Sequence, residues 1–541
     1  MQTKPTTSKK IFFSGVMLLT LSTVLVKLIG LIYKIPMLSY LGSEGMGYFH
    51  SAYEIYALFC IIATAGLPTA LSVLISSALT NQKDGEVESI WKTALHVFLV
   101  IGILGSLLMW GAARQICVWI KSDAAYECIV AIAPTVFFIC ISSALRGYFQ
   151  GHQRMFPTAL SQLIEAIGKL IFGILFARMA LKSGAPTPVV AGAAGWGLTL
   201  GSALGMLYLI VEKLRTRKME RRVAKGQGDC NRAQIRRRLA RLAIPMTLGA
   251  SMVSLTKLID MAMILRRLQS IGYTEIGANE AYGSYTTLAL SVFGLLPTLL
   301  NSVALPLLPM LAAAIAEQNR EKEGKIVALS YRLTAIFSIP AAFGISAFAH
   351  PILTLLFGNE PQAVEIAAPL LSMLGVSVFL SSMITATNSV LHAYQIVMRP
   401  ILSMLAGAVT KLTAAYFLIG MEGVGLYGAP ISTFLCNTVV VLCNLYFASR
   451  HTPDTSFRTL FLPPTLLSAA SIGIAYGTYL WLVYAVGTGT VVTLGCIGLA
   501  VVLYLLLGCL FGMFREEDIL LLPMGERFCK LFHAMHLLPK R

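Results

Sequence analysis

The chain has 541 residues, of which 56% are hydrophobic and only 12% are charged, and its mean hydropathy is +0.75. A water-soluble domain carries about 25% charged residues, so this composition excludes a soluble globular protein and predicts that lipid surrounds most of the chain. The net charge of +17 would favour a nucleic-acid partner in a soluble protein. Here the cations lie mainly between apolar runs, so we attribute them to membrane topology and expect no nucleic-acid partner.

Fourteen apolar stretches are long enough to cross the hydrocarbon core, which takes about 20 helical residues. The first follows Lys4, Lys9 and Lys10, but no small-residue cleavage site closes it, so we expect an uncleaved helix and no signal peptide. The sequence predicts an all-α polytopic membrane protein with spans near residues 11–38, 51–79, 90–112, 125–149, 157–180, 187–211, 239–265, 281–310, 329–349, 363–392, 400–420, 424–448, 463–484 and 488–513. The ninth and tenth spans are the least clearly divided, because the apolar run continues through 352–357.

The Lys and Arg residues orient these spans. With the N-terminus in the cytoplasm, only five of the 42 fall in outside loops: Arg114, Lys121, Lys182, Arg266 and Arg267. This bias predicts that both termini are cytoplasmic. The stretch 213–241 alone holds twelve Lys and Arg residues. It is interpreted as a topology anchor at the anionic leaflet, with binding of a cytoplasmic partner or a lipid headgroup as the alternative.

Two motifs recur at an offset of six helices. The second span contains G-L-P-T-A with Pro68, and the eighth contains L-L-P-T-L with Pro297. The fourth and fifth spans are joined by L-R-G-Y-F-Q, then Pro157 and Lys169. The tenth and eleventh are joined by L-H-A-Y-Q, then Pro400 and Lys411.

The repeat predicts two six-helix lobes around a central cavity, with two extra C-terminal helices. Such an arrangement is typical of alternating-access transporters. The predicted parts are an N-terminal lobe (1–212), a basic cytoplasmic loop (213–241), a C-terminal lobe (242–449), two extra helices (450–514) and a cytoplasmic tail (515–541).

Ionisable residues inside the spans are the candidate functional residues, because each costs at least about 2.5 kcal/mol to insert. Glu165 and Lys169 are four residues apart, and Lys257 and Asp260 are three apart, so each pair can neutralise its own charge on one helix face. A role in substrate binding or gating is the alternative for both pairs. Glu54 is the remaining acid in the spans.

Lys27, Lys34 and Lys411 have no acid nearby in the sequence. Lys27 and Lys34 are seven residues apart and share a helix face with Gly30 between them. Neither ammonium group is compatible with lipid tails, although Lys34 can also extend toward the membrane surface. We expect both lysines to face a water-filled cavity, which suits an anionic ligand such as a diphosphate.

The stretch L-R-G-Y-F-Q-G-H-Q-R-M-F-P places Arg146 near the cytoplasmic end of the fourth span. Gly147 and Gly151 are expected to let the backbone turn, and Pro157 to lie in the first turn of the next helix. The stretch is interpreted as a rigid basic connector, and contact of Arg146 with a lipid-linked phosphate is the alternative.

Several stretches resemble a known family. They are GLIYKIPMLSYLGSEGMGYF, ATAGLPTALS, LRGYFQG, P-T-A-x-S-Q-x-x-E from Pro157 to Glu165, and LIDMAMILRRLQSIGYTEIGANEAYG. They are similar to the stage V sporulation protein B group, which lies near the MurJ-type lipid II flippases in the multidrug/oligosaccharidyl-lipid/polysaccharide exporter superfamily. The resemblance covers about residues 11 to 510.

The resemblance implies a multi-pass protein of the bacterial cytoplasmic membrane that exports an undecaprenyl-diphosphate-linked saccharide, with lipid II as the favoured substrate. It implies that Lys27 and Lys34 stand at cationic first-helix positions where relatives often have Arg. It also implies coupling to Na⁺, H⁺ or the membrane potential. The sequence departs from the better-studied flippases in the second predicted span. Those flippases have charged residues there, whereas residues 60–65 of this chain carry no charged side chain.

Two other functions are weighed against a flippase. A multidrug or cation antiporter of the same superfamily would need membrane acids, whereas this chain has six membrane cations and three acids. A membrane enzyme would need clustered acids or histidines in an outside loop, and these loops are short. We therefore expect no enzymatic activity and no cofactor. The ten cysteines form no CxxC, so we expect no metal site.

Overall fold

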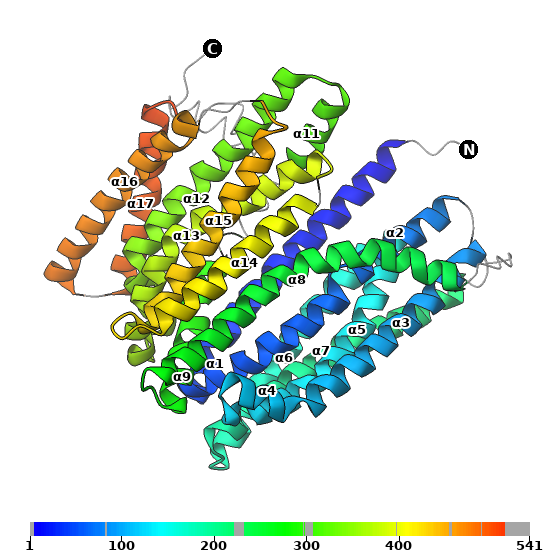
Figure 1. Ribbon diagram of the computed structural model, residues 1–541, viewed down its shortest axis with the longest axis horizontal. Helices are drawn as coiled ribbons and strands as arrows, with labels where there is room; N and C mark the ends of the chain where they lie inside the picture. The colour runs from blue at the N-terminus through cyan, green and yellow to red at the C-terminus, as the bar shows by residue number, and fades with distance from the viewer. Residues whose placement is uncertain are drawn as a thin grey trace. The chain divides into compact units, whose positions relative to one another are not determined.

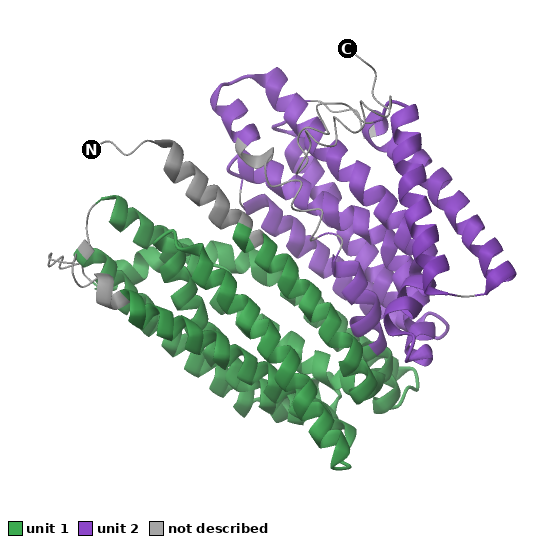
Figure 2. Ribbon diagram, turned by 180° about the vertical axis from the view of Figure 1, so that it is seen from behind, with its two compact units in different colours: residues 1–283 green, residues 284–541 purple. Residues whose placement is uncertain are grey.

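The structure is a computed structural model that describes residues 5–81, 84–220, 232–295, 297, 307–396, 398–453, 457–487 and 489–513. Every regular element within these ranges is a helix, and twelve helical segments there are long and apolar enough to cross a membrane. The predicted all-α polytopic fold is therefore confirmed. The chain forms two compact units, Met1–Gly283 (unit 1) and Ser284–Arg541 (unit 2), which Figure 2 shows in green and purple.

Unit 1 contains ten helical elements within the described ranges. They are α1 (Pro5–Thr64), α2 (Leu67–Thr80), α3 (Asp84–Gly111), α4 (Ala113–Ile120), η1 (Asp123–Ala125), α5 (Tyr126–Gly151), α6 (Met155–Lys182), α7 (Thr187–Glu220), α8 (Arg232–Ser270) and α9 (Glu275–Ser284).

Unit 2 begins with η2 (Tyr285–Ala289), a π-helix. The elements that follow are α11 (Leu307–Ala316), α12 (Arg320–Phe357), α13 (Pro361–Ala393), α14 (Met398–Ile419), η3 (Gly425–Tyr427), α15 (Gly428–Ser449), α16 (Phe457–Val486) and α17 (Thr490–Leu510).

The element α1 folds back on itself at Gly42, where φ is +65° and ψ is 176°, a conformation that glycine adopts without steric cost. Along a straight helix Tyr33 and Phe49 would lie about 24 Å apart. Their ring centroids are only 6.3 Å apart. The element therefore has a first arm before Gly42 and a second arm after it, which runs toward α2 in Figure 1. The two arms belong to the first two predicted spans, which are separate passes.

The second predicted span is interrupted at Ala65 and Gly66, after which α2 starts with Pro68 as its second residue. Gly147 and Gly151 face this helix from within α5. A Cβ atom at Gly147 would lie 2.8 Å from the Pro68 carbonyl oxygen, and one at Gly151 would lie 2.8 Å from the Ile75 Cβ. The prediction that these glycines turn the backbone is wrong, because both belong to α5, with Gly151 as its last residue, neither has a positive φ, and both pack closely on α2.

Much of the predicted basic loop, 213–241, is helical. The helix α7 continues to Glu220, and α8 begins at Arg232. With 39 residues α8 is about 58 Å long, nearly twice the thickness of the hydrocarbon core, so its arginine-rich start extends beyond that core. Pro245 lies inside α8, and Figure 1 shows the helix curving.

The two helix ends that carry the predicted repeat have the same backbone turn, which also ends other described helices, such as α11 at Gln318. After α5 and after α13, Gln153 and Gln395 adopt φ of +57° and +59°. Each turn has the same two backbone hydrogen bonds. After α5, the Gln153 amide donates to the Gln150 carbonyl and the Arg154 amide to the Phe149 carbonyl. After α13, the Gln395 amide donates to the His392 carbonyl and the Ile396 amide to the Leu391 carbonyl. This is the Schellman ending of a helix, with Gln at the position where Gly is usual.

Alignment of this turn in the two units gives a second register for the predicted repeat. It aligns Gln395 with Gln153, whereas the matched letters L-R-G-Y-F-Q and L-H-A-Y-Q aligned it with Gln150. Lys169 and Lys411 each follow the left-handed Gln by sixteen residues, so these two lysines correspond. Pro157 and Pro400 are each the third residue of the next helix, α6 and α14, as predicted. The division into six-helix lobes stays a prediction, since unit 1 also includes α8.

The other predicted spans each overlap one observed helix, apart from the eighth. That span, 281–310, covers the end of α9, η2 and the start of α11, and residues 296 and 298–306 lie outside the described residues, so Pro297 is described as helical without its neighbours. The ninth helix is longer than predicted, because α12 continues through a kink at Phe348 to Phe357. The two extra helices, α16 and α17, pack against each other and against α12, where the Tyr504 hydroxyl donates to the Ile336 carbonyl at 2.8 Å.

Candidate functional site

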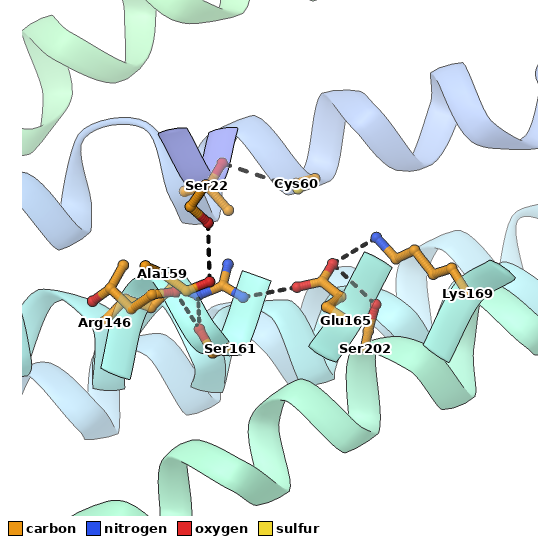
Figure 3. Close-up of polar contacts among 10 residues, drawn as sticks. Ser22, Cys60, Arg146, Ala159, Ser161, Glu165, Lys169 and Ser202 are labelled. Atoms are coloured by element: carbon orange, nitrogen blue, oxygen red, sulfur yellow. Dashed lines mark hydrogen bonds and ion pairs between the residues drawn. The ribbon is translucent and has the colours of Figure 1, made fainter. Parts of the chain in front are cut away.

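The first group of membrane charges is a buried ion network in unit 1, shown in Figure 3. Arg146 Nη2 lies 2.8 Å from Glu165 Oε2, and Lys169 Nζ lies 2.5 Å from Glu165 Oε1. Arg146 Nε also donates to Ser161 Oγ at 3.0 Å, and Ser202 Oγ donates to Glu165 Oε1 at 3.4 Å. The side chains of Arg146, Glu165 and Lys169 are 12%, 10% and 24% exposed.

Close packing of α6 on α7 holds this network in place. A Cβ atom at Gly201 would lie 2.5 Å from the Lys169 amide nitrogen, and one at Gly197 would lie 2.2 Å from the Gly173 amide nitrogen. Only residues without a side chain allow this approach, which is typical of helix contacts in membranes. The approach brings Ser202 of α7 to the Glu165 carboxylate of α6.

The predicted Glu165–Lys169 pair is therefore present, with Arg146 from α5 as a second cation on the same carboxylate. These interactions bind three helices, α5, α6 and α7, to one another. The Arg146 guanidinium is engaged by Glu165 and Ser161, so the structure favours the connector interpretation of the motif around it.

Other contacts of the same motif also support a rigid connector. Arg154 Nη2 lies 3.1 Å from Glu212 Oε1, and Arg154 Nη1 donates to Thr216 Oγ1 at 2.8 Å, which ties the start of α6 to the end of α7. Lys213 Nζ lies 3.1 Å from the centroid of the Tyr148 ring. This cation–π contact stabilises the packing of α7 on α5.

The corresponding turn of unit 2 is held by a different pair. The Tyr394 hydroxyl donates to Glu323 Oε2 at 2.7 Å, and Glu323 is buried at the start of α12. Burial and this hydrogen bond raise the pKa of Tyr394. The two turns share their backbone but not their side-chain contacts.

The second group of membrane charges is a cluster on α1 and α8 of unit 1, which we call the lysine cluster: Lys27, Lys34, Glu54 and Lys257. Lys257 Nζ lies 3.9 Å from Glu54 Oε1, which joins α8 to the second arm of α1. Lys27 and Lys34, on the first arm, are both within electrostatic reach of Lys257. Lys34 also interacts electrostatically with Glu54.

The lysine cluster is more open than the ion network. The Lys257 side chain is 53% exposed, and Lys27 is also exposed. A Cβ atom at Gly30 would meet no atom within 4 Å, so the helix face between Lys27 and Lys34 is unobstructed, in accord with the predicted shared face. The cluster contains three ammonium groups and one carboxylate, and this surplus of positive charge attracts an anion.

Asp260 and His50 lie on the same two elements. Asp260, three residues after Lys257 on α8, is 4% exposed, and His50, one turn before Glu54, is 5% exposed. Lys34 and Lys257 both act electrostatically on the His50 ring. His50 was not among the residues selected from the sequence. Its position four residues before Glu54, on the same helix face as this membrane acid, could have indicated it.

Lys411 lies in unit 2, where it is buried in α14 with 5% of its surface exposed. Its counterpart in unit 1, Lys169, belongs to the ion network. The predicted site residues thus fall into the ion network, the lysine cluster with Asp260 beside it, packing positions at Pro68, Gly147 and Gly151, and Lys411 in the second unit.

The profile of the family described as "Polysaccharide biosynthesis protein" matches residues 12–315, more than half of the chain. The chain belongs to this family. A second profile, MatE, matches residues 245–417.

Among curated proteins, the chain is 22% identical to "Stage V sporulation protein B" of Bacillus subtilis (strain 168), over 96% of this chain and 99% of that protein. It is 25% identical to "Lipid II flippase MurJ" of the same organism, over 86% and 88% of the two chains. These similarities agree with the resemblance seen in the sequence motifs.

Among solved structures, the fold is similar to "Lipid II flippase MurJ, inward closed conformation", with a TM-score of 0.70 and 16% identity over 92% of this chain and 98% of that one. It is also similar to an inward-facing multidrug resistance MATE family transporter of the MOP superfamily, with a TM-score of 0.61 and 15% identity over 79% and 97% of the two chains. The chain therefore has the fold of this transporter superfamily, and the proteins that it is similar to include a lipid II flippase and a multidrug resistance transporter.

Proposed function

We propose that this protein moves a polyprenyl-diphosphate-linked saccharide across the bacterial cytoplasmic membrane by alternating access, with the peptidoglycan precursor lipid II as its substrate. The observation that carries this proposal is the lysine cluster. Lys27, Lys34 and Lys257 lie within membrane-spanning segments, and both Lys27 and Lys34 are within electrostatic reach of Lys257, which pairs with Glu54.

The lysine cluster suits a diphosphate for electrostatic reasons. A diphosphate esterified at both ends carries two negative charges, which three ammonium groups and one carboxylate balance. Lys presents a point charge with three donors and does not impose the planar geometry of Arg, so it can follow a diphosphate as the site opens and closes. The saccharide would occupy the predicted central cavity, while the polyprenyl tail would stay in lipid.

The membrane potential can supply the driving force. With a negative interior, outward movement of a negative headgroup is favoured by about 2.3 kcal/mol per charge per 100 mV. Coupling to Na⁺ or H⁺ is the other source of energy for such a transporter. In our proposal the protein acts as a transporter and not as an enzyme, with both termini in the cytoplasm.

A multidrug or cation antiporter is the second candidate, favoured by the MatE profile match over residues 245–417. A cationic drug would be repelled by the three lysines of the cluster. Such a transporter would depend on carboxylates, of which Glu54 and Asp260 are the candidates in unit 1.

The proposal is tested by rescue of a bacterium depleted of its essential lipid II flippase. Wild type is compared with Lys27→Ala/Lys34→Ala. A matched control is Lys322→Ala/Lys325→Ala, which removes two exposed lysines that pair with Glu317 and Glu321 on the surface of unit 2. Membrane insertion of each protein is measured in parallel.

We expect wild type and the control to restore growth, and the cluster variant to fail at equal abundance in the membrane. Failure of a well-inserted wild type would contradict lipid II as the substrate. Resistance to cationic drugs that depends on Glu54 or Asp260 would instead support the antiporter.

A further inference from the structure

The first turns of α8, residues 232–241, form a basic segment at the predicted cytoplasmic end of unit 1. This segment contains five arginines, and α8 has no Asp or Glu before Asp260. The arginine side chains are exposed, whereas Ile235 and Leu239 are 1% and 2% exposed. One face of the basic segment is therefore packed within unit 1, and the arginines occupy the remaining faces.

Contacts with α2 and α3 fix the position of the basic segment. Ile235 lines a small cavity together with Leu74 of α2 and Ile90 of α3. Arg238 Nη1 lies 3.4 Å from Glu86 Oε1 of α3, and the Glu86 side chain is 15% exposed. The fold thus holds this end of α8 in place and determines which of its faces remains open.

One open face of the basic segment continues into exposed apolar residues. Arg237, Arg241, Ile244 and Leu248 follow one another at steps of four, three and four residues, so they lie on one face of α8. Ile244 and Leu248 are 56% and 52% exposed in a helix that is long and apolar enough to cross a membrane. Because lipid tails are as apolar as leucine, such side chains are compatible with acyl chains.

The two arginines on this face have charge available for a ligand. Arg238 is paired with Glu86, but within the described residues no carboxylate forms an ion pair with Arg237 or Arg241. Along the helix axis, Arg241 precedes Leu248 by about 10 Å. A phospholipid has the same order of groups, with a phosphate at the membrane surface and acyl chains below it.

We propose that this face of α8 binds an anionic phospholipid, whose phosphate lies at Arg237 and Arg241 and whose acyl chain lies against Ile244 and Leu248. Guanidinium groups bind phosphate oxygens through pairs of N–H donors. A headgroup with a net negative charge is favoured over a zwitterionic one, since no acid of this part of α8 can receive an ammonium group. This inference goes beyond the proposed function and does not depend on it.

The test measures lipid binding to the purified full-length protein in neutral detergent, where no membrane surface potential adds to the contacts of the site. The probe is dioleoylphosphatidylglycerol. It is compared with dioleoylphosphatidylcholine, which has the same acyl chains and a zwitterionic headgroup. Native mass spectrometry records the fraction of protein that retains one lipid at each lipid concentration.

The variant is Arg237→Gln/Arg241→Gln. Its matched control is Arg232→Gln/Arg236→Gln, which removes the same charge from a different face of the same segment. A phosphatidylglycerol with a photoreactive diazirine in its acyl chain provides a second measurement on the wild-type protein, because the cross-linked peptide identifies the helix that contacts the chain.

We expect Arg237→Gln/Arg241→Gln to bind phosphatidylglycerol about tenfold or more weakly than wild type, as for the loss of charged hydrogen-bond donors. The control should stay within about twofold of wild type, as is usual for surface substitutions away from a site. Wild type should prefer phosphatidylglycerol to phosphatidylcholine, and the diazirine should cross-link to α8 beyond Arg241.

Four results would overturn the inference. They are equal affinity of wild type for the two lipids, equal losses in the two double variants, cross-links confined to other helices, and displacement of the lipid by inorganic phosphate at a similar concentration. Equal losses would indicate general charge attraction, and displacement by phosphate would indicate a site for a soluble anion. None of these results bears on the lysine cluster, so the proposed function is tested separately.

Discussion

The ion network and the lysine cluster of unit 1 use similar residues in opposite ways. In the ion network, one carboxylate, Glu165, receives an ion pair from Arg146 at 2.8 Å and one from Lys169 at 2.5 Å, and all three side chains are less than a quarter exposed. In the lysine cluster, the ion pair between Lys257 and Glu54 is 3.9 Å long, and Lys257 is 53% exposed.

The lengths of the ion pairs and the exposure of the side chains indicate which membrane charges stabilise the fold and which remain available to a ligand. Short, buried ion pairs hold helices together, because removing one partner leaves an uncompensated charge in the interior. A long ion pair beside an open helix face keeps positive charge accessible. We therefore expect substitutions in the ion network to reduce stability and substitutions in the lysine cluster to reduce binding.

Glu165→Ala gives the largest expected effect. It leaves Arg146 and Lys169 without their shared carboxylate, which should destabilise the protein by about 3–5 kcal/mol, as for other broken buried ion pairs. The measurement is the unfolding temperature and folded yield in detergent. The comparison variant, Glu54→Ala, removes a carboxylate that is 12% exposed but has its ion pair with Lys257 at 3.9 Å, so it should cost less than Glu165→Ala. Equal losses in both variants would remove the distinction between the two regions.

Lys257→Ala should act on binding and not on stability. It removes a charged donor from the lysine cluster, worth about 1.5–3 kcal/mol, so diphosphate affinity should fall about tenfold or more while the unfolding temperature is unchanged. Titration with a dye-labelled farnesyl-diphosphate-linked disaccharide in lipid nanodiscs measures this. Lys325→Ala, which removes an exposed lysine of unit 2, should leave the affinity at its wild-type value. A drop in stability without a change in affinity would assign Lys257 to the fold.

Gly201→Leu tests whether the close packing of α6 on α7 holds the ion network in place. A Cβ atom there already lies 2.5 Å from the Lys169 backbone, so a leucine should force α6 and α7 apart and cost about 1–3 kcal/mol. The unfolding temperature is measured against Gly498→Leu, since a Cβ atom at Gly498 meets nothing within 4 Å. An equal shift in the two variants would contradict the close packing of α6 on α7.

The smallest expected effect concerns the helix-ending turns of the two units, at Gln153 in unit 1 and Gln395 in unit 2. Gln153→Gly and Gln395→Gly relieve the left-handed conformation of a residue with a side chain, and each should stabilise its unit by about 0.5 kcal/mol. Chemical denaturation of both variants measures the gain. Gln150→Gly, inside α5, should instead destabilise by about 1 kcal/mol. Opposite signs for the two substitutions at the shared turns would contradict their structural equivalence.

The sequence predicted most of the fold, because the lipid environment imposes long apolar helices that composition alone reveals. It predicted the shared face of Lys27 and Lys34 and the Glu165–Lys169 pair, since both follow from helical periodicity. It did not predict the Lys257–Glu54 pair or the Arg146–Glu165 pair, because each joins helices that are distant in the sequence.

Two errors have the same physical origin. Glycines near a helix end were assigned to a turn, but Gly147 and Gly151 are needed for contact with α2, and the turn itself is made by Gln153. The prediction used local preference, whereas packing between helices decided the outcome. His50 was missed for a related reason: its significance depends on Lys34 and Lys257, which come from other segments.

The central claim is that the lysine cluster carries a polyprenyl-linked diphosphate across the membrane. The most direct test reconstitutes the purified protein in proteoliposomes with fluorescent lipid II and measures how quickly the headgroup becomes accessible on the opposite side. We predict transfer by wild type and by Lys322→Ala/Lys325→Ala, and none above protein-free vesicles by Lys27→Ala/Lys34→Ala. Transfer by the cluster variant at the wild-type rate would contradict the claim.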